Sequence, residues 1–312
     1  MGGAVIDVVK LRKYFPGVKA VNGITFHVNQ GDIFGFIGPN GAGKTTTIRI
    51  LSTLSEPTSG EVFVDGLDCV NEPEKVRQII GYMPDYFGVY EDVRVWEYLD
   101  FFAAAYAIPR AQRKSRIEAV MELTDLEDLR HRMVSDMSKG MRQRLCLAKT
   151  LLHEPKVLIL DEPASGLDPR ARIEIRELLK ELADMGKTIF LSSHILTELS
   201  DLCNTVGIIE QGKLLAAGNW KDIVKDLSTA VCYCLSVASR GPEAAEALGR
   251  MEKVSAVEAF DGEINFQYSG KIEELYRVIK ELVDAEIPIT ALKQSDENLE
   301  TLFMRVTNGG VA

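Results

Sequence analysis

The sequence contains no long apolar run. None of its stretches approaches the roughly 18 to 20 consecutive apolar residues that span a bilayer. Asp7 and Lys10 fall where a signal peptide needs an unbroken apolar stretch, so we expect no cleaved leader. The opening Met1-Gly2 also lacks the Ser or Thr at position 6 that N-myristoylation prefers. A role at a membrane would therefore need a partner that holds the protein there.

Positive charge and paired cysteine motifs are scarce as well. The 36 Lys and Arg residues are outnumbered by 46 Asp and Glu residues, which gives a formal net charge of −10. Because affinity for nucleic acid depends largely on cations, this balance argues against a nucleic-acid partner. The five cysteines, at positions 69, 146, 203, 232 and 234, have no CxxC spacing and no matching histidine set. We expect reduced, mostly buried thiols in a cytoplasmic protein.

The sequence does have enough apolar material for more than one core. Its 312 residues are 46% hydrophobic and 26% charged, which is typical of a globular chain of two domains. We expect an α/β domain over residues 4–220, with a mainly helical insert over about residues 86–155. The pattern changes near residue 229, where short strands begin to alternate with helices. A small α+β domain is therefore expected over residues 229–312.

Local patterns predict several individual elements. The hairpin dipeptide Asn22-Gly23 predicts that residues 18–28 form two strands. Four consecutive aliphatic residues, Val157–Leu160, predict a strand buried on both faces, as in a parallel sheet. In the small domain, Asp261-Gly262 predicts a hairpin, and the apolar spacing of residues 271–284 predicts an amphipathic helix. A short helix is expected at residues 299–306.

A glycine-rich loop follows the apolar run Ile33–Ile37 and precedes a helical pattern. Glycines let consecutive backbone N–H groups point at an anionic phosphate, and the positive end of the following helix adds to the attraction. Lys44 would reach the β/γ-phosphates and Thr45 would place its hydroxyl on Mg²⁺. A turn that merely joins a strand to a helix is the weaker interpretation, because the motif matches throughout. The loop comprises Gly38, Pro39, Asn40, Gly41, Ala42, Gly43, Lys44, Thr45 and Thr46.

Two acids and a histidine follow buried strands. Asp161 and Glu162 come directly after Val157–Leu160, at the edge where open α/β sheets bind their ligands. One carboxylate there can hold Mg²⁺, and the next can accept a proton from an attacking water. A purely structural pair would leave two adjacent carboxylates without an electrostatic partner, which is costly. His194 ends a second such strand, and both a structural and a catalytic role stay open for it.

Three further features have two interpretations each. Ser138 stands where the N-cap of a helix is expected, and a helix start can bind an anion or nothing. Tyr14, shortly before the phosphate loop, could stack on an adenine ring or pack beside a turn. The aromatic residues between Tyr86 and Tyr106 could form a core or a docking surface.

Taken together, these motifs resemble those of the ATP-binding-cassette ATPases, in their order and spacing, over roughly residues 4–220. The resemblance implies a P-loop NTPase fold with an antiparallel β subdomain and a helical insert. It also implies that Lys44 and Thr45 bind ATP and Mg²⁺, and that Asp161 holds the metal through water. Glu162 would be the general base and His194 would contact the γ-phosphate.

The same resemblance implies that the ATP site is shared between two cassettes that close head to tail. Ser138 and Gly140 would then act in trans, with Asp168 beside the interface, while Tyr14 would stack on the adenine. The chain has one phosphate loop and no internal repeat. We therefore expect the second cassette from another chain, as a homodimer or as a heterodimer with another ABC ATPase.

The chain departs from the family pattern in two places. Met137-Ser138-Lys139-Gly140-Met141 stands where the family usually has Leu-Ser-Gly-Gly-Gln, and it keeps the serine and the second glycine. Asp85 stands where the family has a glutamine after its Gly-Tyr-x-Pro turn. Asp85 is shorter and negatively charged, and it can face Mg²⁺ directly or through water.

Within the family, the chain looks most like the ATPase subunits of bacterial multidrug or export-type transporters whose membrane domain is a separate polypeptide. Residues 86–106 would then receive a short helix from a membrane-spanning partner, which would hold the protein at the inner face of the cell membrane. The alternative is a soluble ABC-type ATPase acting on the ribosome or DNA, but the chain lacks the second cassette or coiled-coil insert usual there. An importer subunit would differ only in direction, which no residue fixes.

Overall fold

The structure is a computed structural model that describes residues 3–86, 88–195, 199, 202–220, 222–223, 231–260 and 262–294. The chain forms two compact units, Met1–Trp220 and Lys221–Ala312. Each unit has its own core, and each is described by itself.

A four-stranded antiparallel sheet forms one side of the first unit, in the order β2-β1-β4-β5. Strands β1 (Ala4–Phe15) and β2 (Val18–Asn29) are joined by Pro16-Gly17, and β4 (Ser59–Val64) and β5 (Leu67–Asp68) complete the sheet. The hairpin predicted at Asn22-Gly23 is wrong, because β2 passes through both residues. Gly17 already closes the turn with a φ of 76°, and the buried residues on either side of Gly23 keep that segment extended within the core.

A six-stranded, mostly parallel sheet lies at the centre of the first unit, in the order β10-β9-β3-β8-β7-β6. Its parallel strands are β3 (Ile33–Ile37), β6 (Ile80–Met83), β7 (Val157–Leu160), β8 (Thr188–Ser193) and β9 (Thr205–Glu210), and β10 (Lys213–Asn219) is antiparallel to β9. Every residue of β3, β7 and β8 is buried. The prediction of an α/β fold with a parallel sheet is therefore confirmed.

Aromatic packing joins the two sheets. The rings of Phe26, Phe34, Phe36 and Phe190 lie within 5.3 to 6.5 Å of one another, centroid to centroid. Each of these rings is almost completely buried, and burial of such a ring contributes about 1.5–3 kcal/mol. This cluster fixes β3, which leads into the phosphate loop, against its neighbours.

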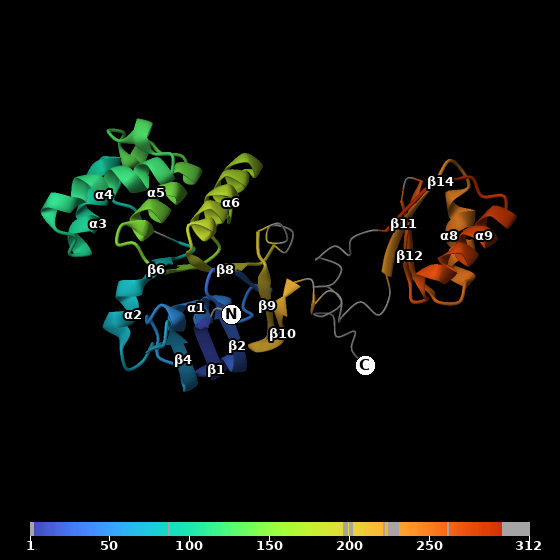
Figure 1. The fold of residues 1–312 in the computed structure, drawn as a ribbon, viewed down its shortest axis with the longest axis horizontal. Helices are drawn as coiled ribbons and strands as arrows, with labels where there is room; N and C mark the ends of the chain where they lie inside the picture. Colours follow the sequence, from blue (N-terminus) through green and yellow to red (C-terminus); the bar gives the residue numbers. More distant parts are fainter. Residues whose placement is uncertain are drawn as a thin grey trace. The chain divides into compact units, whose positions relative to one another are not determined.

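The described helices of the first unit are α1 and α2 near the sheets, those of the insert, and α6. Helix α1 (Lys44–Leu51) follows the phosphate loop, and α2 (Pro73–Ile79) precedes β6. The helical insert contains α3 (Val95–Ala105), α4 (Arg110–Leu123), α5 (Lys139–Leu151) and the short turns η1 (Glu127–Leu129) and η2 (Val134–Asp136). Figure 1 shows α3, α4 and α5 grouped on the side of the unit away from β1, β2 and β4. Helix α6 (Pro169–Asp184) runs beside them.

The second unit is an antiparallel sheet with two helices. Its strands β11 (Val231–Val237), β12 (Val254–Phe260), β13 (Glu263–Tyr268) and β14 (Ile289–Gln294) pair in the order β12-β13-β11-β14. Helices α8 (Gly241–Arg250) and α9 (Leu275–Asp284) bury apolar faces in its core, and η3 (Ile272–Glu274) precedes α9. The predicted helix at residues 271–284 thus begins with a 3₁₀ turn. The helix predicted at residues 299–306 lies outside the described residues.

The five cysteines are free thiols, as predicted. Three of them, Cys69, Cys146 and Cys203, are buried in the first unit, and Cys232 and Cys234 are half-buried in the second. Burial raises the pKa of the Cys69 thiol to about 12, so it is not a ready nucleophile.

Candidate active site

The phosphate loop lies between the C-terminal end of β3 and the start of α1. Its lysine is almost completely buried at 6% exposure, and Lys44 Nζ donates hydrogen bonds to Gly38 O at 2.7 Å and Pro39 O at 3.3 Å. Gly41 and Gly43 take φ values of 80° and 112°, which L side chains rarely adopt. The carbonyl oxygens of the loop hold the ammonium group at the start of α1, where a helix N-terminus attracts an anion.

Close backbone approaches explain two glycines of the loop. A Cβ atom at Gly38 would lie 2.2 Å from the carbonyl oxygen of Ile209, and one at Gly43 would lie 2.4 Å from that of Ala20. Both obstacles are backbone atoms, which cannot turn aside as a flexible side chain can. The loop can keep this position only while both residues lack a side chain.

We expect Gly38→Ala to lower the free energy of unfolding by about 3 kcal/mol, because the added carbon overlaps the β9 backbone. Thermal unfolding of the nucleotide-free protein measures this. The matched control is Gly41→Ala, whose added carbon meets nothing within 4 Å, so only its left-handed backbone should cost about 1 kcal/mol. Equal losses in the two variants would contradict the steric explanation.

Asp161 is a buried carboxylate at the end of β7. Its exposure is 1%, and its Oδ1 accepts a 2.6 Å hydrogen bond from Ser192 Oγ. Burial raises the pKa of Asp161, and the charges of Glu162 and Asp85 act in the same direction, whereas hydrogen bonds from Ser192 and Thr45 act against it. A positive charge placed beside Asp161 would therefore stabilise the ionised form of its carboxyl group.

Glu162 stands between the phosphate loop and His194. Its Oε1 lies 3.5 Å from Lys44 Nζ, and its Oε2 lies 2.7 Å from His194 Nδ1. An ionised carboxylate only accepts hydrogen bonds, so the bond fixes a proton on Nδ1 of the imidazole. The Glu162 side chain is 12% exposed, which leaves it open to a small reactant.

The donor groups fit a magnesium ion bound together with phosphate. Within the part of the chain that the structure describes, no three His, Cys, Asp or Glu side chains are grouped to hold a metal alone. Mg²⁺ is usually held by one or two carboxylates together with substrate phosphates and waters. Asp161, the Thr45 hydroxyl and Asp85 supply oxygen donors of this kind, and the accumulated negative charge at Asp161 favours a cation.

All three predicted catalytic residues, Lys44, Glu162 and His194, line one pocket of about 520 Å³ together with other predicted site residues. Gln211 also lines it, from the turn between β9 and β10, and was not predicted. The only sequence signal for it was its place in a turn after a parallel strand. The predicted residues among the pocket's described lining are Asn40, Gly41, Gly43, Lys44, Thr45, Thr46, Asp85, Glu162 and His194.

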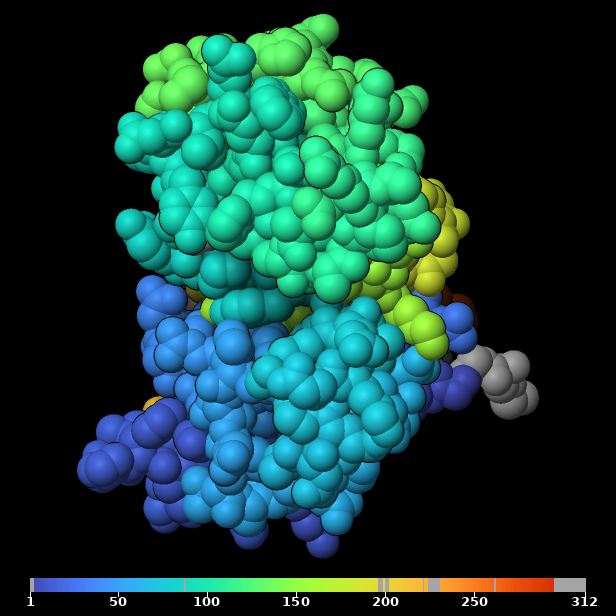
Figure 2. All heavy atoms as spheres, turned by 90° about the vertical axis from the view of Figure 1, so that its left-hand side faces the viewer, coloured from blue at the N-terminus to red at the C-terminus, as the bar shows by residue number. Residues whose placement is uncertain are grey.

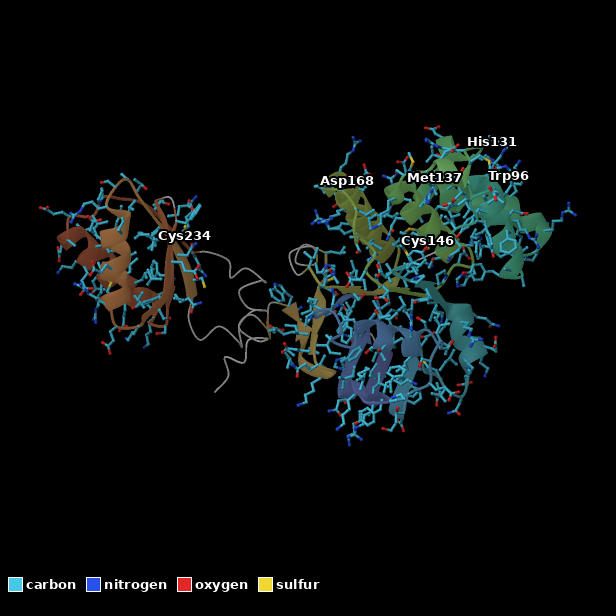
Figure 3. All side chains as sticks on the ribbon, turned by 180° about the vertical axis from the view of Figure 1, so that it is seen from behind. Trp96, His131, Met137, Cys146, Asp168 and Cys234 are labelled. Carbon is cyan, nitrogen blue, oxygen red and sulfur yellow. The ribbon has the colours of Figure 1, made fainter. Side chains whose placement is uncertain are left out.

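Three predicted residues lie elsewhere in the same unit. Ser138 caps α5, where its Oγ accepts from Met141 N at 3.3 Å, and Asp168 caps α6, where its Oδ1 accepts from Ala171 N at 3.0 Å. A Cβ built on Gly140 would lie 3.3 Å from Ala171. Figure 3 shows Asp168 and Met137, the neighbour of Ser138, on the side away from the antiparallel sheet. Ser138, Gly140 and Asp168 are not among the described residues that line the pocket of Lys44.

Tyr14 is also absent from the described lining, although Lys19 of the facing strand is part of it. The Tyr14 hydroxyl donates to Asn22 Oδ1 at 2.8 Å, and Lys19 Nζ lies 5.9 Å from its ring centroid. Phe15, which was not predicted, is a second exposed aromatic residue of the same turn. The stacking role of Tyr14 stays a prediction, and Phe15 is the neighbouring candidate.

Comparison with known proteins places this site in context. A family model described as ABC transporter matches residues 21–165. The linearmycin resistance ATP-binding protein of Bacillus subtilis (strain 168) is 30% identical over 305 residues, 97% of this chain and 98% of its own. The Nod factor export ATP-binding protein I of Burkholderia pseudomallei (strain K96243) is 31% identical over 309 residues, 98% of each chain. A solved ATP-binding subunit of an ABC transporter is 32% identical with a TM-score of 0.64, and the match covers 71% of this chain and 92% of that one.

Proposed function

Because this chain belongs to the ABC transporter family, as an ATP-hydrolysing subunit, we propose that it energises export through a separate membrane-spanning partner. The single observation that carries the outward direction is that relatives aligned over 97 to 98% of this chain are named for export and for resistance. Transport of a compound out of the cell would account both for export and for resistance to that compound. Neither name points to the alternative of a ribosome- or DNA-directed ATPase.

The arrangement of the pocket supports a direct attack of water on the γ-phosphate. Glu162 accepts the proton of the water as its oxygen bonds to the γ-phosphorus, while the bond to the β–γ bridging oxygen breaks to give ADP and phosphate. Lys44 faces the transferred group, and the hydrogen bond from His194 orients the Glu162 carboxylate. Mg²⁺, held by Thr45, Asp161 and Asp85, would neutralise negative charge on the phosphate oxygens.

We propose that the ATP site is completed by Ser138, Gly140 and Asp168 of a second cassette. Ser138, Gly140 and Asp168 carry the sequence pattern of nucleotide contacts, yet they are not among the described residues lining the pocket of their own chain. A helix N-terminus such as that of α5 attracts phosphate. A head-to-tail dimer, formed with an identical chain or with another ABC ATPase, would bring these residues to the partner's ATP. Closure on ATP would then move the membrane partner, and hydrolysis would release it.

Exposed aromatic residues on the insert support a docking surface for the membrane partner. Tyr86, Tyr90 and Phe101 are 88%, 58% and 53% exposed, and the rings of Tyr90 and Phe101 meet edge to face at 5.4 Å. Figure 2 shows the face on which the insert, in teal and green, meets the blue and cyan segments along a shallow furrow. Asp85, next to Tyr86, lines the nucleotide pocket, so this surface adjoins the site of hydrolysis. No helix in the described ranges is long and apolar enough to cross a membrane.

We expect the native protein, tagged and extracted with detergent from membranes of its own cells, to carry a polytopic membrane protein with it. Phe101→Asp should lower recovery of that partner about tenfold or more, because a carboxylate would enter an apolar contact. Leu215→Asp, which also charges an exposed apolar site but on β10, is the matched control and should leave recovery unchanged. Nucleotide binding should be the same in both variants. Equal recovery with Phe101→Asp, or no membrane partner at all, would contradict the proposal.

A further inference from the structure

The backbone of Glu162 is strained. Its φ is 51°, in the left-handed region that non-glycine residues rarely enter. Such a conformation costs about 1–3 kcal/mol and persists only when surrounding contacts determine it. The Glu162 N–H donates to Ser192 Oγ at 3.0 Å, and the Glu162 carbonyl accepts from Ser165 N at 3.0 Å. These contacts act on the residue from the sheet and from its own turn.

A third contact reaches this turn from helix α5. Gln143 is 2% exposed, and its Nε2 donates a 2.6 Å hydrogen bond to the carbonyl oxygen of Pro163, the residue after Glu162. The proline ring fixes φ, which removes one of the two backbone torsions between the Glu162–Pro163 peptide and this carbonyl. The hydrogen bond from Gln143 is therefore separated from the Glu162–Pro163 peptide by one freely rotating backbone torsion.

Other contacts join α5 to the segment that follows Glu162. The ammonium of Lys139 lies over Gly166, where an added Cβ would be only 2.2 Å from Nζ. Gly140 packs against Ala171 on α6, and Arg144 forms an ion pair with Glu174 of the same helix. Among these contacts of α5, the hydrogen bond of Gln143 is the one made to Pro163, directly after Glu162.

We infer that Gln143 is a positioning residue for hydrolysis, which ties the orientation of the Glu162 carboxylate to the position of α5. The inference rests on the proposed function, in which Ser138 at the start of α5 contacts ATP held by the second cassette. When that ATP binds to Ser138, it sets the position of α5. The hydrogen bond from Gln143 to Pro163 then makes the orientation of the general base, Glu162, depend on where α5 lies. Glu162 thus reaches its productive orientation when the site is closed.

The test replaces Gln143 by methionine, which is similar in length but cannot donate a hydrogen bond. We expect kcat for ATP to fall about 10-fold to 100-fold, because a small misplacement of a catalytic group costs that much. The Kd for ATP and ATP-dependent dimerisation should stay within about twofold of wild type, since Gln143 is not among the described lining of the nucleotide pocket. Gln112→Met on the exposed surface of α4 is the control for replacing a glutamine by methionine.

A second variant separates positioning from a merely structural role. In Gln143→Glu, a protonated carboxyl can donate to Pro163 O and an ionised one cannot. Burial raises the pKa of a carboxyl, so its turnover relative to wild type should rise as the pH is lowered from about 9 to 6. Dividing the turnover of the variant by that of wild type at each pH removes the effect of groups that titrate in both proteins. The charged groups around position 143 are Lys139, Arg142 and Arg144 on α5, Asp161 and Glu162 after β7, and Glu174 on α6.

The outcomes are distinct. If the wild-type protein hydrolyses ATP and Gln143→Met has the same kcat, the inference about Gln143 is overturned while the proposed function stands. A loss of kcat accompanied by equal losses in Kd, dimerisation and thermal stability, with no pH-dependent recovery in Gln143→Glu, would also overturn it. Absence of turnover in the wild-type protein with its partner would instead contradict the proposed function.

Discussion

Glu162→Gln should reduce ATP turnover about 10²- to 10⁴-fold, the usual cost of losing a general base. Glutamine keeps the size of the side chain, but its amide cannot accept the proton of an attacking water. Lys44 Nζ, 3.5 Å from the Glu162 carboxylate, also loses its negative neighbour and can face phosphate more fully. ATP binding should therefore persist or tighten, and the closed dimer should accumulate.

Phosphate release and gel filtration, each with and without ATP and Mg²⁺, measure the two parts of this result. Glu61→Gln, at an exposed position of β4, is the control for removing one negative charge. If Glu162→Gln hydrolyses ATP at the wild-type rate, Glu162 is not the base and the catalytic assignment is wrong. If it stops turnover without forming a dimer, the head-to-tail arrangement loses its support.

Asp161→Asn should change stability and activity in opposite directions. Since burial raises the pKa of Asp161 in the folded state, folding opposes its ionisation, and the carboxylate destabilises the nucleotide-free protein above the pKa of the unfolded chain. This penalty is present at neutral pH, declines as the pH falls below the folded-state pKa of Asp161, and is gone below the pKa of the unfolded chain. Asparagine removes the charge, and we expect a gain of about 1 kcal/mol, which is roughly 2–4 °C in Tm for a unit of this size.

The same substitution should lower Mg²⁺-dependent turnover about 100-fold or more, because a neutral amide is a poorer ligand for a hard cation. Thermal unfolding at pH 7 and phosphate release with and without EDTA measure the two effects. Asp7→Asn, on the exposed side of β1, should change neither. A lower Tm for Asp161→Asn would show that its hydrogen bonds outweigh the cost of burying its charge.

Sequence reasoning succeeded where local pattern and local chemistry agree. The four aliphatic residues Val157–Leu160 could be read as a strand buried on both faces, because the strands of a parallel sheet are covered on both sides. The phosphate loop was located by spacing alone, since the close approaches at Gly38 and Gly43 permit no side chain. The antiparallel pair β12 and β13 likewise follows from a turn dipeptide between alternating strands.

The failures have a common physical cause, which is tertiary contact. Asn22-Gly23 is a good turn, but burial of its flanking residues kept β2 extended. Ser192 and Gln143 are ordinary residues in their own segments, and they matter because of atoms 30 and 20 positions away in sequence. The stacking role of Tyr14 stays a prediction, because Phe15 beside it is exposed as well.

The hydroxyl of Ser192 has a consequence for how this site can evolve. Its single proton goes to Asp161 Oδ1, and the same oxygen accepts the N–H of Glu162, so one atom is shared by the two acids. A substitution at position 192 therefore alters both acids in one mutational step, and natural selection cannot tune them separately through this position. Threonine keeps the hydroxyl, but its added methyl group would enter a position with 0% exposure, so even this replacement meets a packing cost.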